Sequence, residues 1–291
     1  MRSQGVRRTQ HEASRDDEVT WEPTLRSFWE IDNMGINPEP SASSKNPVVG
    51  ELRGDCPQND ERYEVALPWK QDPANLLKDN FEVSMTRLKK LLIKLQRTDG
   101  LLLRYDSVIR EYFNLGHAEV VDERVETQNP IYYMPHSAVI REDRVTTKVR
   151  VVFDASSHAP SCPSLNECLD KGVCLNPDIL QLLLRFRSYK IALTADIEKA
   201  FLQVQIRPED RDVFRYLWLE QPPSPEAIPD VSHAVQTLRM TRVPFGATSS
   251  PFLLSATIQH HLAGVAGEYK ATAMKLKQSF YVDDLVTEQI Q

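Results

Sequence analysis

Long apolar runs, a set of paired cysteines and an excess of basic residues are all missing from this sequence. None of the 291 residues lies in an uncharged apolar stretch as long as the roughly 18 residues that a membrane-spanning helix needs. The 4 cysteines are too few for a disulfide scaffold. No apolar run follows the basic residues of the N-terminus, as it would in a secretory signal. We therefore expect an intracellular, cytoplasmic protein that is neither secreted nor bound to a membrane.

The overall charge is slightly acidic, at −6. Domains that bind nucleic acids are usually basic, so this balance argues mildly against such a partner. A phosphate backbone responds to local basic surface rather than to total charge, however. A cluster of metal-binding acids would also lower the net charge without changing that surface. The acidic net charge therefore lowers the expectation of nucleic-acid binding only slightly.

Three regions differ in composition. Residues 1–60 are polar, charged and rich in Pro, Ser and Asn, which predicts a largely disordered segment and linker with one short helix near 24–36. Residues 61–190 begin with helical patterns and turn to β patterns, and residues 191–291 place short apolar runs beside acids. We expect an α+β fold with antiparallel strands.

The best helical pattern covers residues 81–96. Leucines form one face of this helix, and basic residues that include Lys89, Lys90 and Lys94 lie on the rest. Such a face can contact phosphates, although a solvated face without a ligand is the more common reason for a run of charges. A second helix is predicted over 101–114, with its end near Gly116.

From residue 131 onward, β patterns dominate. We predict strands within 131–140, 148–156, 191–195 and 213–219, the third of them buried. Helices are predicted over 179–186 and from an N-cap at Ser249, with Pro251 near the first helical position, to about Leu262. The apolar flanks of the acids in 280–286 indicate a tight β-hairpin.

Two adjacent acids, Asp283 and Asp284, occupy the middle of that hairpin in the segment FYVDDLV. An acid pair alone carries little weight, since Asp16 and Asp17 form another in polar surroundings. Between strands, however, two carboxylates at a partly buried sheet edge repel and resist ionising unless a cation binds among them. Mg²⁺, which prefers oxygen ligands, is the cation we expect.

A third acid, Asp196, follows the strand pattern of 191–195. A lone acid at a strand end is as often a turn or cap residue. If this strand neighbours the hairpin, Asp196 and Asp283 can share two Mg²⁺ ions about 3.5–4 Å apart, an arrangement suited to in-line phosphoryl transfer.

These acids stand in segments that resemble reverse transcriptases. The likeness rests on YVDD (281–284) for the metal-binding turn, TADIEKAF (194–201) and VPFGATSSPFLL (243–254) for two palm motifs, and KVRVVFDAS (148–156) followed by Ser164-Leu165-Asn166 for the fingers. Other segments are most similar to Pao/BEL long-terminal-repeat retrotransposons: FWEIDNMGI, YEVALPWK, YYMPHSAVI and ILQLLLRFR. The resemblance extends over residues 25–287.

The resemblance implies a right-hand polymerase with fingers at 61–190 and an incomplete palm at 191–291. Its antiparallel palm sheet would be packed with helices, and the chain stops before a thumb. As an RNA-directed DNA polymerase it would add dNTPs to a primer 3′ end on an RNA or DNA template. The two Mg²⁺ ions, for which Mn²⁺ can substitute, would be held by Asp196, Asp283 and Asp284.

The resemblance also assigns residues around the nucleotide. Phe201 matches the bulky residue that excludes a ribose 2′-hydroxyl, and Arg150 matches the fingers arginine that grips the triphosphate. Gly246 matches the glycine beneath the nascent base pair, and Phe245 stands where retroviral enzymes carry glutamine. Backbone N–H groups near Ala200 and Phe201 would face phosphates. Without the motifs, Phe201 would be taken as a core aromatic, Arg150 as an exposed strand residue and Gly246 as a turn glycine.

Template contacts are assigned less specifically, to Tyr281 and to the basic residues of 81–96. The fingers lysine of the family has no clean counterpart, and Arg141 and Arg144 both remain candidates. The spacing of three cysteines near His158 fits no common zinc pattern, so we expect thiols without a metal at Cys162, Cys168 and Cys174. His260 and His261 are expected on a helix surface.

The remaining parts of such a polyprotein, namely thumb, RNase H and integrase, would be partners if the full protein exists, in a retroelement particle. An inactive remnant that at most binds nucleic acid through its basic residues is the alternative function. A two-metal nuclease or phosphatase would need the carboxylates but would leave Phe201 and the VPFG segment without a purpose.

Overall fold

The computed structural model describes residues 62–72, 77–140, 149–223 and 234–288. All of them belong to the unit formed by Ser41–Gln291. The predicted disordered segment, the helix near 24–36, and both candidates for the fingers lysine, Arg141 and Arg144, lie outside the described residues. Within the described residues, no helix combines the length and the apolar character needed to cross a membrane.

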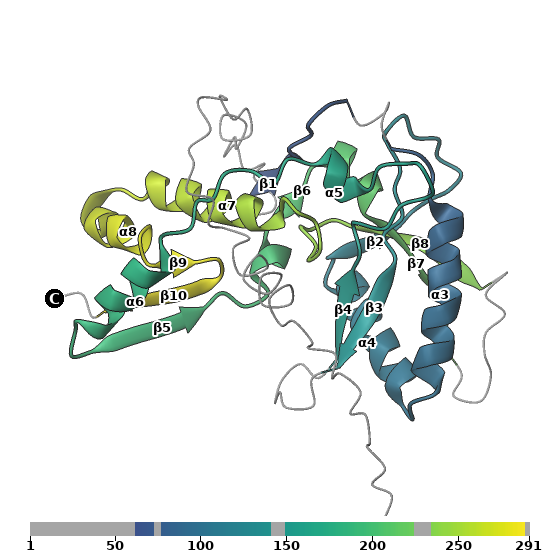
Figure 1. The fold of residues 1–291 in the computed structure, drawn as a ribbon, viewed down its shortest axis with the longest axis horizontal. Coiled ribbons are helices and arrows are strands. Elements are labelled where there is room, and N and C mark those ends of the chain that lie inside the picture. Colours follow the sequence, from purple (N-terminus) through teal and green to yellow (C-terminus); the bar gives the residue numbers. More distant parts are fainter. Residues whose placement is uncertain (1–61, 73–76, 141–148, 224–233, 289–291) are drawn as a thin grey trace, which may run out of the picture. The chain divides into compact units, whose positions relative to one another are not determined.

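Two amphipathic helices confirm the strongest helical patterns of the sequence: α3 (Phe81–Gln96) and α4 (Leu101–Asn114). They lie side by side (Figure 1) because each has one apolar face. The α3 helix buries Leu88, Leu91, Leu92 and Leu95, and its lysines remain exposed. Between the helices, Gly100 adopts a φ of 65°, a left-handed conformation that glycine tolerates at the start of α4.

The helices α3 and α4 cover two β-structures. One is an antiparallel sheet in the order β2-β8-β7, built from β2 (Ala118–Val120), β8 (Val235–Met240) and β7 (Arg215–Leu219). The other is an antiparallel ribbon of β3 (His136–Ile140) and β4 (Val149–Phe153). Side chains alternate between buried and exposed along β4, whereas all five residues of β7 are buried. The β4 strand therefore has one exposed face and β7 has none.

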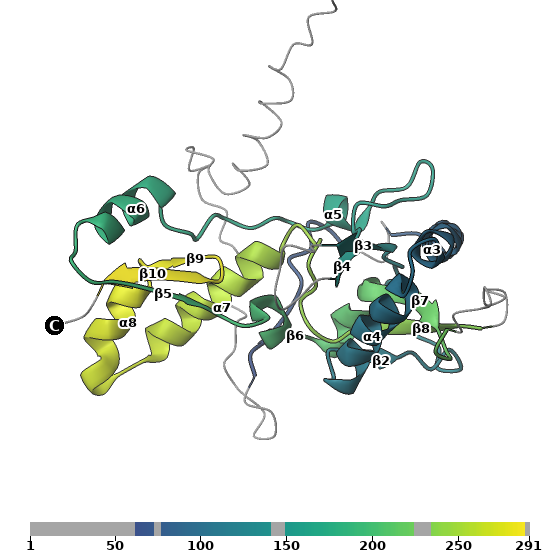
Figure 2. The same cartoon turned by 90° about the horizontal axis from the view of Figure 1, so that it is seen from below.

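A third antiparallel sheet, in the order β5-β10-β9, holds the acids. Its strands are β5 (Ala192–Asp196), β9 (Phe280–Tyr281) and β10 (Asp284–Glu288). Figure 2 shows α6 (Ile179–Arg187) over one face of this sheet, with α7 (Ser250–Gly264) and α8 (Lys270–Leu276) on the other side. The hairpin predicted over 280–286 is confirmed.

The prediction that the strand before Asp196 is buried was wrong. All five residues of β5 are exposed, because β5 lies at the edge of the sheet and α6 packs against β10 instead. The apolar run of β5 thus lies in an edge strand, which has a neighbouring strand on one side only.

Shorter elements complete the described fold. The segment Tyr63–Trp69 contains the two-residue strand β1 (Glu64–Val65), which pairs in parallel with β6 (Gln205–Ile206). A capping box formed by Ser164 and Glu167 starts the one-turn α5 (Leu165–Cys168). The 3-10 helices η2 (Ala200–Gln203), η3 (Pro208–Phe214) and η4 (Gly267–Tyr269) form turns between the larger elements.

The expected N-cap at Ser249 was also wrong in its chemistry. The α7 helix starts where predicted and has proline near its first position, but Ser249 makes no side-chain capping bond. Its hydroxyl is buried and has no hydrogen-bond partner among the described residues. The backbone of Ser249 is helical rather than extended, so its side chain does not reach the free N–H groups of the first turn.

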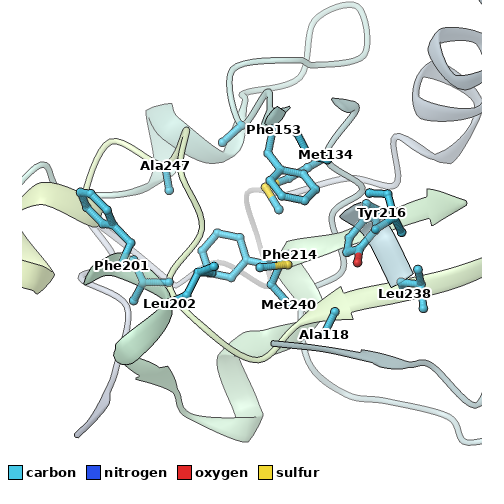
Figure 3. Packing of buried hydrophobic residues seen from close by; sticks show 14 of the residues in the cluster. Ala118, Met134, Phe153, Phe201, Leu202, Phe214, Tyr216, Leu238, Met240 and Ala247 are labelled. Atoms are coloured by element: carbon cyan, nitrogen blue, oxygen red, sulfur yellow. The ribbon is translucent and has the colours of Figure 1, made fainter. Parts of the chain in front are cut away.

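The hydrophobic core joins the acid-bearing region to the other sheets. Figure 3 shows its side chains running from Phe201 and Leu202 through Phe214 and Met240 toward Tyr216. Because η2 begins only four residues after Asp196, this packing restrains the end of the strand that carries Asp196.

Candidate active site

The three predicted acids come together at one end of the β5-β10-β9 sheet. In the antiparallel pairing of β10 with β5, Asp284 lies directly opposite Asp196, so both side chains project from the same face. Asp283 is in the turn immediately before β10, and its carbonyl oxygen accepts a hydrogen bond from the Ile197 N–H at 3.2 Å. The turn is thereby attached to the chain just after Asp196.

The electrostatics of the acids follow from this geometry. Burial raises the pKa of Asp283, and the negative charges of Asp284 and Asp196 raise it further. Asp283 is half-buried, whereas Asp196 and Asp284 are exposed. Mutual repulsion among carboxylates is the condition under which a bound cation stabilises their charged forms.

The donor chemistry of this cluster suits a hard divalent cation. Carboxylate oxygens are the ligands that Mg²⁺ prefers, and the three acids lie on two adjoining segments. Among the described residues, however, no three acidic, histidine or cysteine side chains converge as a ready-made metal-binding group. The sharing of two Mg²⁺ ions by Asp196 and Asp283 therefore stays a prediction.

The YVDD turn has an unusual backbone. Asp284 pairs with Tyr281, which leaves Val282 and Asp283 as the two central residues of the hairpin. Val282 has a φ of 58°. Two-residue hairpins need positive φ at their first central position, where glycine is the usual residue. A β-branched side chain there is strained, and such strain persists only where surrounding contacts hold it.

In the segment after Asp196, the N–H group of Ala200, which was predicted to face phosphates, has an acceptor within its own turn. The N–H of Ala200 is donated to the Ile197 carbonyl oxygen at 3.2 Å, and that of Leu202 to the Lys199 carbonyl oxygen at 2.8 Å. Lys199 has a φ of 51°, and η2 that follows is a short 3-10 helix rather than the start of an α-helix. The Ala200 amide is thus already used, because the tight turn supplies an internal acceptor.

Phe201 is buried and packs on Phe245, with 4.5 Å between ring centroids. Phe245 itself is 49% exposed. Phe201 therefore belongs to the core, as expected for a buried aromatic side chain. It also supports the exposed ring of Phe245. The structure brings these two predicted nucleotide-binding residues together.

Only glycine, which has no side chain, fits at position 246. It has a φ of 108°, and a Cβ at this position would collide with the carbonyl oxygen of Phe153 at the end of β4. The loop that contains Gly246 can therefore lie directly against the end of β4. Close backbone approach explains the glycine here, and a role beneath a base pair stays a prediction.

Asn166, to which no role was assigned in the sequence analysis, connects two distant segments. Its side-chain amide donates to the Ser156 hydroxyl at 2.8 Å and to the Gly246 carbonyl oxygen at 3.1 Å. Its side-chain oxygen accepts from the Thr248 N–H at 2.8 Å. These bonds join the turn after β4 to the loop of Gly246. The segment Ser164-Leu165-Asn166 was the signal that could have indicated such a role.

The basic residues predicted to contact phosphates are exposed, and they lie on elements that precede the three acids in the chain. Arg150 is exposed on β4, opposite Val139 of β3. Lys89, Lys90 and Lys94 are exposed on α3. Arg87, on the same helix, forms an ion pair of 2.5 Å with Asp154 just after β4. The helix is thus linked to the strand that carries Arg150.

The described cysteines and the histidines of α7 differ in how far they are buried. Free thiols are buried at Cys168, half-buried at Cys162 and exposed at Cys174. On α7, His261 is exposed and its Nδ1 lies 2.9 Å from the hydroxyl of Tyr63. A cavity of about 470 Å³, lined by residues that include Phe81, Glu126 and Arg215, contains none of the predicted site residues.

Comparison with known proteins identifies the family. The model of the family "Reverse transcriptase (RNA-dependent DNA polymerase)" matches residues 140–287, just over half of the chain. This chain belongs to the reverse transcriptase family. Its matched region contains both palm motifs, the YVDD turn and strand β4.

Solved structures add one similar example, the foamy viral protease-reverse transcriptase dRH in complex with ds DNA. The identity is 18% and the TM-score 0.42, over 64% of this chain. The match spans 26% of the foamy viral chain, about a quarter of its length. No curated protein sequence matches the chain.

Proposed function

We propose that this chain supplies the fingers and palm of an RNA-directed DNA polymerase, which transfers dNTPs onto a primer 3′ end by a two-metal mechanism. The observation that carries the proposal is the register of β10 on β5, which sets Asp284 opposite Asp196 beside the turn that contains Asp283. Membership of the reverse transcriptase family supports the reaction type.

In this proposal Asp196, Asp283 and Asp284 hold Mg²⁺, or Mn²⁺ in its place. The bound ions would supply charge neutralisation for in-line displacement at the α-phosphate. Arg150 contributes a planar guanidinium for phosphate oxygens. Phe201, supported by Phe245, narrows the space beside the sugar.

The context we propose is the polyprotein of a Pao/BEL long-terminal-repeat retrotransposon, acting in a cytoplasmic particle. Residues 61–190 serve as fingers and residues 191–291 as the first part of the palm. Thumb, RNase H and integrase domains are the expected companions, and a template with its primer is the expected nucleic-acid partner. The motif wording over residues 25–287 supports this narrower assignment.

The test is primer extension by the full chain on an RNA template with Mg²⁺, comparing wild type with Asp283→Asn. The variant keeps the side-chain shape but loses the charge that a cation requires. We expect incorporation to fall by at least roughly 100-fold. Asp99→Asn, an exposed acid beyond α3, is the matched control and should behave as wild type. Equal incorporation by wild type and Asp283→Asn would refute the assigned role.

A binding protein without catalysis is the second candidate, and the exposed lysines of α3 favour it. In that case nucleic acid binds in a manner that weakens steeply with salt, and no primer is extended by any variant. The same primer-extension experiment therefore separates the two candidates.

A further inference from the structure

The N–H group of Val282 is hydrogen-bonded by a side chain from a distant loop. Asn176 lies between α5 and α6, and its Oδ1 accepts from the Val282 N–H at 3.3 Å. The same Oδ1 accepts from the Ser255 hydroxyl of α7 at 3.1 Å. Because the Val282 backbone nitrogen can only donate, the group that faces it must be the amide oxygen rather than the amide nitrogen.

This contact falls on the strained residue of the turn. Val282 is the β-branched residue with a φ of 58°, and it occupies the position before Asp283. A left-handed backbone at a β-branched residue is strained, so it persists only where surrounding contacts stabilise it. Asn176 provides one such contact, and the bond from the Ile197 N–H to the Asp283 carbonyl oxygen provides another.

Asn176 is itself held in place. Ser255 is buried in α7, so the shared oxygen is tied to a rigid helix. Two residues further on, the Asp178 side chain accepts from the Gln181 N–H at 2.8 Å and starts α6. The loop between α5 and α6 is therefore attached to α6 and α7 at the point where it meets the turn.

We infer that Asn176 is a positioning residue that keeps the YVDD turn in its strained conformation and so places Asp283 and Asp284 for metal binding. The inference rests on the proposed function for its catalytic consequence, but the contact with the turn can be measured without catalysis. Asn176 touches neither substrate nor metal in this role; it acts through Val282.

Three variants of the full chain test the inference. Asn176→Ala removes the acceptor, whereas Asn176→Asp keeps an oxygen that both donors can use. Asn129→Ala is the matched control, since Asn129 is also half-buried but its side-chain amide donates to Asp212 of η3, at 3.5 Å. All three variants are first compared by circular dichroism to establish that they fold.

The first measurement is amide hydrogen exchange in residues 280–288. We expect exchange at Val282 to accelerate roughly tenfold or more in Asn176→Ala, with Asn176→Asp within about threefold of wild type. Asn129→Ala should leave this segment unchanged. Unchanged exchange in Asn176→Ala would overturn the inference, whether or not the chain is an active polymerase.

The second measurement is the affinity for Mn²⁺, followed by electron paramagnetic resonance in titrations of the full chain. Asn176→Ala is expected to bind Mn²⁺ at least roughly threefold more weakly, because its acids are less well placed. In primer extension, kcat should fall roughly tenfold while KM for dNTP stays within about twofold.

These outcomes separate the two claims. If exchange accelerates while Mn²⁺ affinity and kcat stay at wild-type values, Asn176 supports the turn without positioning the acids, and the inference fails. If the wild type extends no primer, the proposed function fails, and exchange with Mn²⁺ affinity still decides the role of Asn176.

Discussion

Single residues in this protein have their chemistry set by burial, and His136 is the clearest case. Its Nε2 lies 2.9 Å from the Leu217 carbonyl oxygen and its Nδ1 lies 2.6 Å from the Tyr105 hydroxyl. A carbonyl can only accept, so Nε2 carries the proton and Nδ1 accepts from Tyr105. Burial lowers the pKa of His136 from 6.5 to about 4, although its bond to Leu217 acts in the opposite direction.

A pH dependence of stability follows from His136. The unfolded chain binds a proton on this histidine near pH 6.5, whereas the folded chain does so only near pH 4. Stability should therefore decrease as pH falls between these values, by about 2 kcal/mol at pH 5 relative to pH 7.5. The measurement is urea unfolding across this range. His136→Gln should show a shallower slope, and an identical slope in both proteins would contradict this assignment.

At the scale of elements, the two predicted helix starts at α6 and α7 differ in how they are capped. Asp178 caps α6 through its bond to the Gln181 N–H, as short polar side chains do at helix starts. Ser249 precedes α7 without such a bond, and in the described part of the chain its buried hydroxyl has no partner. The same kind of sequence signal thus has two structural outcomes, decided by the backbone conformation of the cap residue.

Opposite effects on stability are expected from removing these two side chains. Asp178→Ala should lower the free energy of unfolding by about 1 kcal/mol, because a cap is lost. Ser249→Ala should leave it unchanged or raise it by up to about 1 kcal/mol, because a buried hydroxyl without a partner is removed. Urea unfolding midpoints compare the variants. A loss in Ser249→Ala as large as in Asp178→Ala would restore the capping role.

Over the whole described molecule, charge is separated by element rather than balanced locally. The chain carries −6 overall, yet the exposed side of α3 presents lysines, and the acids gather at the end of the β5-β10-β9 sheet. Local fields of this kind attract or repel a phosphate backbone more strongly than the net charge does.

Binding to a template–primer duplex should therefore depend on α3. In Lys89→Gln/Lys90→Gln/Lys94→Gln, we expect weaker binding, and the slope of log affinity against log salt should decrease by roughly 2 to 3. Fluorescence anisotropy at several salt concentrations measures the slope. Lys270→Gln, an exposed lysine on α8, serves as control. A slope unchanged by the triple substitution would place the nucleic acid elsewhere.

Much of the fold could be predicted from the sequence, and each wrong prediction has its own physical cause. The helices over 81–96 and 101–114 and the hairpin around Asp283 were confirmed because hydrophobic periodicity and flanking residues act within a few positions. The burial of β5 was predicted wrongly because an apolar run does not say which side of a sheet will be covered. The N–H group of Ala200 has an acceptor within its own turn, and a phosphate contact by this segment stays a prediction.

The sequence by itself determined the local elements, the order of the motifs and the identity of the acidic residues, since these depend on neighbours along the chain. Only the tertiary structure decided that Asp284 lies opposite Asp196, and that Asn176 accepts a hydrogen bond from Val282. Both depend on contacts between segments far apart in the chain. Such contacts arise from packing of the whole unit, and no pattern in either segment encodes the partner.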